Sequence, residues 1–421
     1  MSIKLISKKA KIVEAIFLVI LIVAIFVSFF KPIQAGHGAI GIKAEPLQIG
    51  DRFFYISDND PFAADNSITF EDFKPFKGGP LYPNILKGIS FISIKLFKQS
   101  STSMLWNFIT ISISSILTFF TVRFTYASGR MLFDERTGII AMIFFTLCPY
   151  SYFYALSGGI TIYTLFGTTL CTYLILKIFN CNFKNYLNNK KTLEKIFLFI
   201  VLIYMSLLRP SSIIFCIVVA LIITSLEILN FLKYKKDKKL SSFFIFIFII
   251  SLVVSLNQLW ETKNYSVFTL NAFSIEKGTF MGLDRDLMRY KIQILFESSE
   301  ILKNLEGFLY QVLWKMNDFL TGIIDIRDTH DSTIPLLSFL IRITVGTILL
   351  APITYLSILG IFIFRRKIIN TGLWICLLAS IVSISPSLIG VAMSRYYYMF
   401  ITPFVLISAM TISKISNLKK I

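Results

Sequence analysis

The polar residues best suited to chemistry lie in one stretch between the first two long apolar segments. Asp51 is followed by Arg52 and Tyr55, and Lys74 and Lys77 come further along. A carboxylate beside aromatic side chains suits a general base that takes the proton of a hydroxyl group. Arg52, Lys74 and Lys77 are secondary candidates for binding a phosphate group. The alternative for Asp51 is an ordinary solvated loop aspartate.

Two arginines stand at the ends of apolar segments. Arg209 lies between Leu208 and Pro210, and Arg395 precedes three tyrosines. A guanidinium at membrane depth costs about 2–3 kcal/mol on insertion scales unless it is paired or reaches the headgroups. A phosphate would pair it through charge-assisted hydrogen bonds. We therefore predict Arg209 and Arg395 as phosphate ligands, with snorkelling to the headgroups as the alternative.

Two tyrosines are candidates for contact with a carbohydrate, because aromatic faces and hydroxyl groups suit a sugar. These are Tyr55 and Tyr82. The alternative is that both belong to the belt of aromatic residues at the membrane surface. For the tyrosines at 396–398 the belt is the favoured interpretation.

The sequence gives little support for a metal site or for disulfide bonds. His37 and His330 are the two histidines, and His330 lies between Asp328 and Asp331 with no further partner at ligand spacing. The five cysteines include no C-x-x-C pair, so we predict them to be small packing residues. We predict no metal site and no cofactor, although the sequence leaves a divalent ion open.

The elements that must position these residues are apolar. Of the 421 residues, 55% are hydrophobic and only 16% are charged, whereas about a quarter of a soluble domain is charged. This composition excludes an ordinary water-soluble enzyme. Runs long enough to cross a bilayer occur at 12–30, 104–125, 138–155, 160–179, 196–209, 211–230, 241–257, 336–364, 371–391 and 396–413. We predict an all-α polytopic membrane protein of about ten transmembrane helices.

The net charge of +18 fits the positive-inside rule. With the N-terminus in the cytoplasm, lysine and arginine gather in the short cytoplasmic loops, and the two long outer loops are almost neutral. We therefore expect both termini in the cytoplasm and no nucleic-acid partner. The first apolar run is predicted to be a retained anchor rather than a cleaved signal.

Two outer loops divide the chain. An N-terminal transmembrane module (1–257) includes the first loop at 31–103, the second extracytoplasmic region is 258–335, and transmembrane helices fill 336–421. Within the first loop, 84–97 has one apolar stripe and a Lys87/Lys95 side, which predicts a helix in the interface plane. Within the second loop, mixed charge over 283–320 favours a solvated surface.

The order of these features resembles the membrane-integral glycosyltransferases of the GT-C type. More narrowly, it resembles the branch with the protein O-mannosyltransferases, the lipid A aminoarabinose transferase and the rhizobial core-sugar transferases. The matching elements are Asp51 with Tyr55, Gly79-Pro80-Leu81-Tyr82-Pro83, the turn from Gly129 to Gly138, Pro149, Leu208-Arg209-Pro210-Ser211 and Ser394-Arg395-Tyr396-Tyr397. In one departure, Arg52 stands where the family often has a second carboxylate.

The resemblance implies an inverting glycosyltransferase. Its donor would be a sugar on a polyprenyl phosphate or diphosphate, and its acceptor a glycolipid, a polysaccharide or a protein. Asp51 would be the catalytic base, and the site would face the extracytoplasmic side of a bacterial-type plasma membrane. Two alternatives stay open: an O-antigen-polymerase or ligase-like enzyme, which would not need Asp51, and a lipid or polysaccharide transporter, which would form no glycosidic bond.

Overall fold

The computed structural model describes most of the helical part of the chain. The described residues are 7–31, 33–35, 38–43, 81–98, 104–179, 191–234, 238–263, 299–307, 309–310, 313, 348–389 and 394–418. Five predicted site residues lie outside these ranges: Asp51, Arg52, Tyr55, Lys74 and Lys77.

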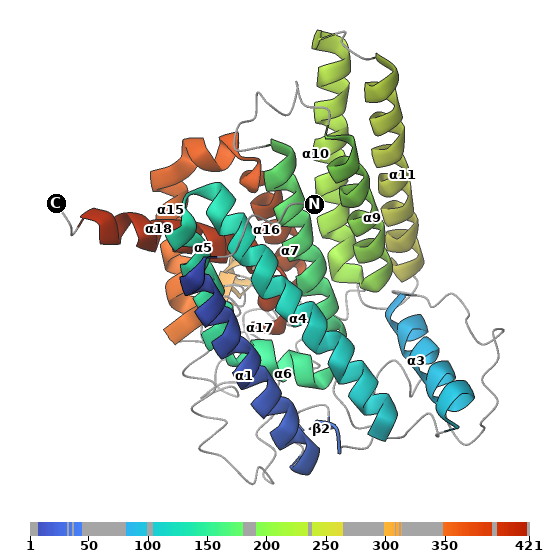
Figure 1. The fold of residues 1–421 in the computed structure, drawn as a ribbon. Coiled ribbons are helices and arrows are strands. Elements are labelled where there is room, and N and C mark those ends of the chain that lie inside the picture. Colours follow the sequence, from blue (N-terminus) through green and yellow to red (C-terminus); the bar gives the residue numbers. More distant parts are fainter. Residues whose placement is uncertain are drawn as a thin grey trace.

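The fold is a bundle of helices (Figure 1). Its elements are α1 (Lys8–Phe30), α3 (Leu81–Phe97), α4 (Met104–Leu132), α5 (Glu135–Leu147), α6 (Pro149–Ser157), α7 (Ile160–Phe179), α9 (Thr192–Leu208), α10 (Pro210–Tyr234), α11 (Lys238–Lys263), α15 (Ala351–Asn370), α16 (Leu373–Ile389), α17 (Ser394–Met399) and α18 (Thr402–Leu418). Between α1 and α3, the short strands β1 (Ile33–Ala35) and β2 (Gly38–Ile40) pair antiparallel, with Ile33 opposite Ile40.

Six helices within the described ranges are long and apolar enough to cross a membrane, or seven spans if the bent pair α5 and α6 counts as one. The prediction of an all-α membrane protein is therefore confirmed, and the count of ten spans is not. Helices α9, α16 and α18 coincide with predicted spans, but each has only 17 residues. In a bilayer core of about 30 Å, a straight span needs about 20 residues.

The third predicted span, 138–155, is not one straight helix. Helices α5 and α6 meet at a 58° bend, because Pro149 has no backbone N–H to give to the carbonyl of Phe145 one turn earlier. The Ser151 hydroxyl replaces that donor and lies 2.7 Å from the Phe145 oxygen. The bend therefore leaves no buried carbonyl unpaired at this position.

Two later predicted spans also differ from straight helices. The last, 396–413, is divided into α17 and α18 by Phe400 and Ile401. The eighth, 336–364, extends in α15 to Asn370, with non-helical dihedral angles at Phe364. Apolar composition predicts that a segment enters the membrane, but it does not predict where the backbone within that segment bends.

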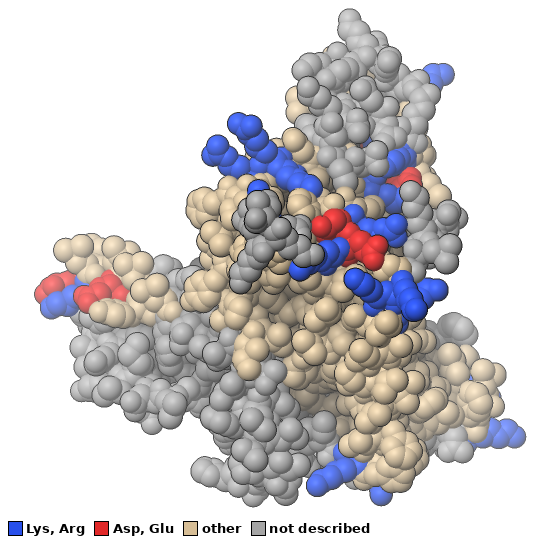
Figure 2. Space-filling model, turned by 60° about the vertical axis from the view of Figure 1, so that its left-hand side comes forward, with Lys and Arg blue, Asp and Glu red and all other residues tan. Residues whose placement is uncertain are grey.

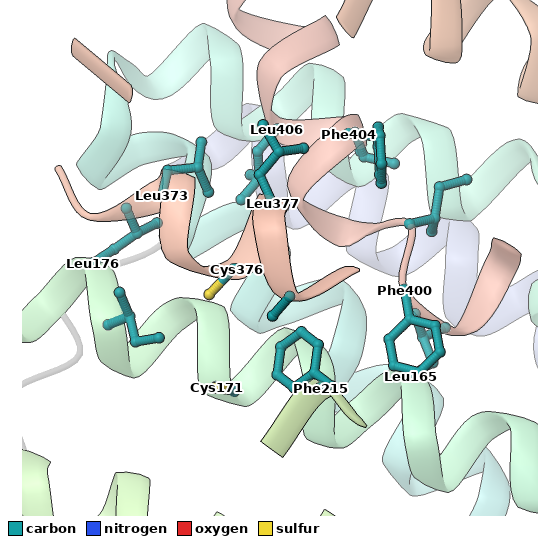
Figure 3. Packing of buried hydrophobic residues seen from close by; sticks show 14 of the residues in the cluster. Leu165, Cys171, Leu176, Phe215, Leu373, Cys376, Leu377, Phe400, Phe404 and Leu406 are labelled. Carbon is teal, nitrogen blue, oxygen red and sulfur yellow. The ribbon is translucent and has the colours of Figure 1, made fainter. Parts of the chain in front are cut away.

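Helix α7 runs through the centre of the bundle and contacts α4, α9, α16, α17 and α18. Figure 3 shows Leu165 and Leu176 of this helix within a layer that includes Leu377 and Phe400. Most buried threonines of α7 donate their hydroxyl proton to the backbone carbonyl one turn earlier. These are Thr164, Thr168, Thr169 and Thr172. The four described cysteines are buried and free, as predicted for packing residues.

Charged side chains are unevenly spread over the surface. Figure 2 shows lysine and arginine, with a few acidic neighbours, gathered mainly in the upper half of the face in view. Ion pairs join neighbouring helices, with Arg123 of α4 2.7 Å from Glu14 of α1 and Lys177 of α7 3.0 Å from Glu194 of α9. All four residues belong to the ends that the charge pattern assigns to the cytoplasm.

Candidate active site

Tyr82, a predicted sugar-contacting residue, is fully buried in the first turn of α3. Its hydroxyl donates to the carbonyl of Gly158 at 2.9 Å, and its ring stands edge-on to Tyr163 with the centroids 5.4 Å apart. Gly158 ends α6 in the left-handed conformation, with φ 59°, which glycine adopts without steric cost. Tyr82 thus fixes α3 to the turn between α6 and α7. The structure gives it a positioning role, and its contact with a sugar stays a prediction.

The rest of α3 differs in part from the predicted interfacial helix. Leu86 and Ile89 are buried, whereas Ile92, Leu96 and Phe97 of the same apolar stripe are exposed. The prediction of an exposed lysine side is wrong for Lys87, which is buried, and is confirmed for Lys95, which is exposed. The reason is that α3 packs on both α4 and α9, so its first half is covered over more of its circumference than one stripe.

Both described ends of the loop that contains Asp51 are fixed to the beginning of α4. Asn107 donates from Nδ2 to the carbonyl of Ile42 at 3.2 Å, and Trp106 donates from Nε1 to the carbonyl of Leu86 at 3.5 Å. Ile42 precedes the undescribed segment 44–80, and Leu86 belongs to the helix that follows it. The described residues on either side of 44–80 are therefore both fixed to the first turn of α4.

Arg209 lies at the turn between α9 and α10, with extended dihedral angles of −159° and 147°. Its Nη1 donates to the sulfur of Met399 in α17 at 3.7 Å. Leu208, the preceding residue, packs in the same buried cluster as Tyr82 and Tyr163. The arginine turn, the beginning of α3 and the beginning of α7 thus form one continuous region.

Helix α17 is held by two hydroxyl contacts. The Tyr397 hydroxyl lies 2.6 Å from Oγ1 of Thr354 in α15, and the Tyr398 hydroxyl lies 2.8 Å from Oγ of Ser151 in α6. Both tyrosines are buried, so the interpretation as membrane-belt residues is wrong for them. They instead fix a six-residue helix that carries Arg395 in its first turn.

The structure therefore brings together part of the predicted site. Arg209 contacts Met399 of the helix whose first turn includes Arg395, and the side chains of Arg395 and Tyr396 lie outside the described atoms. Sequence reasoning missed Ser151 and Thr354, which position α17. The hydroxyl two residues after Pro149 was the available signal for Ser151.

Among the described residues, no group of three His, Cys, Asp or Glu side chains is arranged to hold a metal ion.

Comparison with solved structures places this arrangement in a known fold. The crystal structure of the Archaeoglobus fulgidus oligosaccharyltransferase in its apo form matches with a TM-score of 0.50 at 14% identity. The match covers 97% of this chain and 50% of the archaeal chain. The chain has the GT-C fold. The resemblance inferred from the sequence motifs is thereby confirmed for the fold, and this GT-C chain spans about half the length of the archaeal enzyme.

Two other solved structures are similar over most of the chain. AglB from Archaeoglobus fulgidus, in complex with an inhibitory peptide and a dolichol-phosphate, matches with a TM-score of 0.45 at 14% identity, over 95% of this chain and 50% of that one. ArnT from Cupriavidus metallidurans, bound to undecaprenyl phosphate, matches with a TM-score of 0.34 at 12% identity, over 96% of this chain and 78% of that one. No protein-family model and no curated protein matches the sequence.

Proposed function

We propose that this GT-C chain is a glycosyltransferase that moves a sugar from a polyprenyl-phosphate-type lipid to an extracytoplasmic acceptor. The acceptor would be a glycolipid, a polysaccharide or a protein, and the anomeric carbon would be inverted. The observation that supports the proposal is the contact between Arg209 and Met399, because it sets Arg209 against the short helix whose first turn includes Arg395.

The arginine geometry suits a leaving phosphate. A guanidinium at this turn would bind a phosphate oxygen through a charge-assisted hydrogen bond. Arg395 stands one helical turn before Met399 on α17 and would supply a second cation. Arg52, Lys74 and Lys77 would add further positive charge from the first outer loop.

The reaction would be a single displacement. The acceptor oxygen forms a bond to the anomeric carbon as the bond from that carbon to the phosphate oxygen breaks, and the phosphate keeps the electron pair. Asp51 would take the acceptor proton, since a hydroxyl group is a weak nucleophile until its proton has a positioned acceptor. Tyr55 would contact the sugar, and Tyr82 would hold α3 against the region.

The proposed setting is a bacterial-type plasma membrane with both termini in the cytoplasm and the site on the outer face. The uneven surface charge and the apolar helices support this placement. The proposal requires no cofactor, because the displacement needs only a base and cations at the leaving group.

A reconstituted assay tests the proposal. Full-length protein in liposomes would receive the radiolabelled polyprenyl-linked sugar that accumulates in cells lacking it, together with a membrane extract of those cells as the acceptor source. We expect a new labelled product whose glycosidic bond has the opposite anomeric configuration to the donor. Movement of the labelled lipid between leaflets without a new bond would instead identify a transporter, and full transfer by an Asp51→Asn variant would favour a ligase-like enzyme.

A further inference from the structure

A helical stretch of the second outer region exposes large apolar side chains along one face. The helical residues of this stretch are 301–307, 309, 310 and 313. Five apolar residues are spaced at i, i+1, i+4, i+8 and i+12, which places them on one face of a helix: Ile301, Leu302, Leu305, Leu309 and Leu313. Their exposed fractions are 84%, 78%, 55%, 53% and 61% respectively.

The opposite face meets the protein. Gly307 is buried, Asn304 is half-buried, and the Oδ1 atom of Asn304 is inaccessible to solvent. A solvated amphipathic helix normally packs its apolar stripe on the core and turns its polar side to water. Here the apolar stripe is exposed, and the covered positions are Asn304 and Gly307, so packing on the core does not account for the apolar side chains of this stretch.

We propose that the apolar face of 301–313 lies on the lipid bilayer, as an interfacial helix. The stretch lies between α11 and α15, two helices that are long and apolar enough to cross a membrane, so the membrane tethers it on both sides. An apolar face flanked by polar side chains is the pattern of helices that lie at the boundary between headgroups and acyl chains. The inference concerns membrane contact and does not depend on the proposed enzymatic activity.

The charges of this stretch favour lipid over a charged macromolecule. Lys303 and Glu300 form an exposed ion pair at 3.0 Å, and Glu306 is the one other charged residue of 301–307. The polar side is thus close to neutral and presents no basic patch for anionic headgroups. Helix α3 of the first outer loop shows the same feature, since Ile92, Leu96 and Phe97 expose its apolar end.

Site-directed fluorescence in lipid nanodiscs tests the proposal. The full-length Leu305→Cys variant would be labelled with an environment-sensitive dye in phosphatidylcholine nanodiscs, and Lys303→Cys, on the same helical segment, is the matched control. Unsubstituted protein gives the labelling background, which should be low because the four described native cysteines are buried. Quenching by a nitroxide attached to the lipid acyl chain is compared with quenching by aqueous iodide.

We expect the dye at Leu305→Cys to be quenched at least about twofold more by the lipid nitroxide than by iodide, and the order to reverse at Lys303→Cys. Leu309→Cys repeats the measurement on the apolar face if Leu305→Cys does not fold. Equal iodide quenching at Leu305→Cys and Lys303→Cys would overturn the proposal in favour of a solvated loop. Protection of Leu305→Cys from both quenchers would overturn it in favour of a protein contact.

Discussion

The guanidinium of Arg209 donates a hydrogen bond to the sulfur of Met399 at 3.7 Å. This contact joins the turn between α9 and α10 to the short helix α17, and the two residues are 190 positions apart in the sequence. Arg395 stands one turn before Met399 on that helix. Two arginines from distant parts of the sequence therefore occupy one region of the bundle, next to the cluster that fixes α3.

Replacing both arginines tests their role at the leaving group. We expect Arg209→Ala and Arg395→Ala each to reduce kcat by about 100-fold or more, the scale for loss of a donor that stabilises transition-state charge. Lysine at either position should restore only part of the rate, because an ammonium lacks the bidentate geometry of a guanidinium. The measurement is turnover of purified, folded variants at saturating donor. Unchanged turnover in the double alanine variant would mean that both side chains merely reach the headgroups.

The predicted base is tested by Asp51→Asn, which keeps the shape of the side chain and removes its basicity. We expect membrane insertion and donor binding to stay normal while transfer falls by about a hundred- to ten-thousand-fold. Asp58→Asn, Asp60→Asn and Asp65→Asn are matched controls from the same loop and should lose little. Full activity of Asp51→Asn, with loss in one control, would move the base to that control residue.

Ser151 and Tyr398 should contribute unequally to stability. A serine hydroxyl has one proton, and the Ser151 hydroxyl lies 2.7 Å from the Phe145 carbonyl. It therefore accepts from Tyr398 at 2.8 Å. Tyr398→Phe removes one net hydrogen bond and should cost about 0.5–1.5 kcal/mol, whereas Ser151→Ala removes the partner of two buried groups, at about 1–3 kcal/mol each. Denaturation midpoints of the two variants in detergent test the order, and equal midpoints would contradict this proton assignment.

A buried ion pair links α9 to α10 and should be sensitive to loss of one partner. Nζ of Lys195 lies 2.6 Å from Oε1 of Glu227, the side chains are 5% and 0% exposed, and the ammonium also lies 4.8 Å from the centre of the Phe244 ring. Glu227→Ala should lower the free energy of unfolding by about 3–5 kcal/mol, because a charge is left buried without its counterion. The double variant Lys195→Met, Glu227→Leu should recover most of that loss.

The exposed pair of Lys303 and Glu300 provides the control for that experiment. Its side chains are 50% and 63% exposed, so solvent screens the attraction, and Glu300→Gln should change the free energy of unfolding by at most about 1 kcal/mol. An equal effect of the buried and exposed substitutions, measured by the same denaturation assay, would show that burial does not set the energy of the Lys195–Glu227 pair.

The sequence by itself determined that the longest apolar segments become membrane helices. The length and composition of an apolar run decide whether it enters a bilayer, since a backbone in hydrocarbon must satisfy its hydrogen bonds within its own segment. The six long spans follow from that local rule. Basic residues in the short loops likewise indicated a side for the termini, and the order of the motifs around Asp51, Pro149 and Arg209 indicated the GT-C fold.

Only the tertiary structure decided which side of each helix is buried and what it meets. Within an apolar segment every face is hydrophobic, so periodicity does not distinguish a lipid-facing residue from a packed one. The burial of Tyr82 against Gly158, of Tyr398 against Ser151 and of Lys87 in α3 therefore could not be predicted. The contact of Arg209 with Met399 is of the same kind. It depends on how separate helices pack after each has formed, and that packing is a property of their combined shapes rather than of any single stretch of sequence.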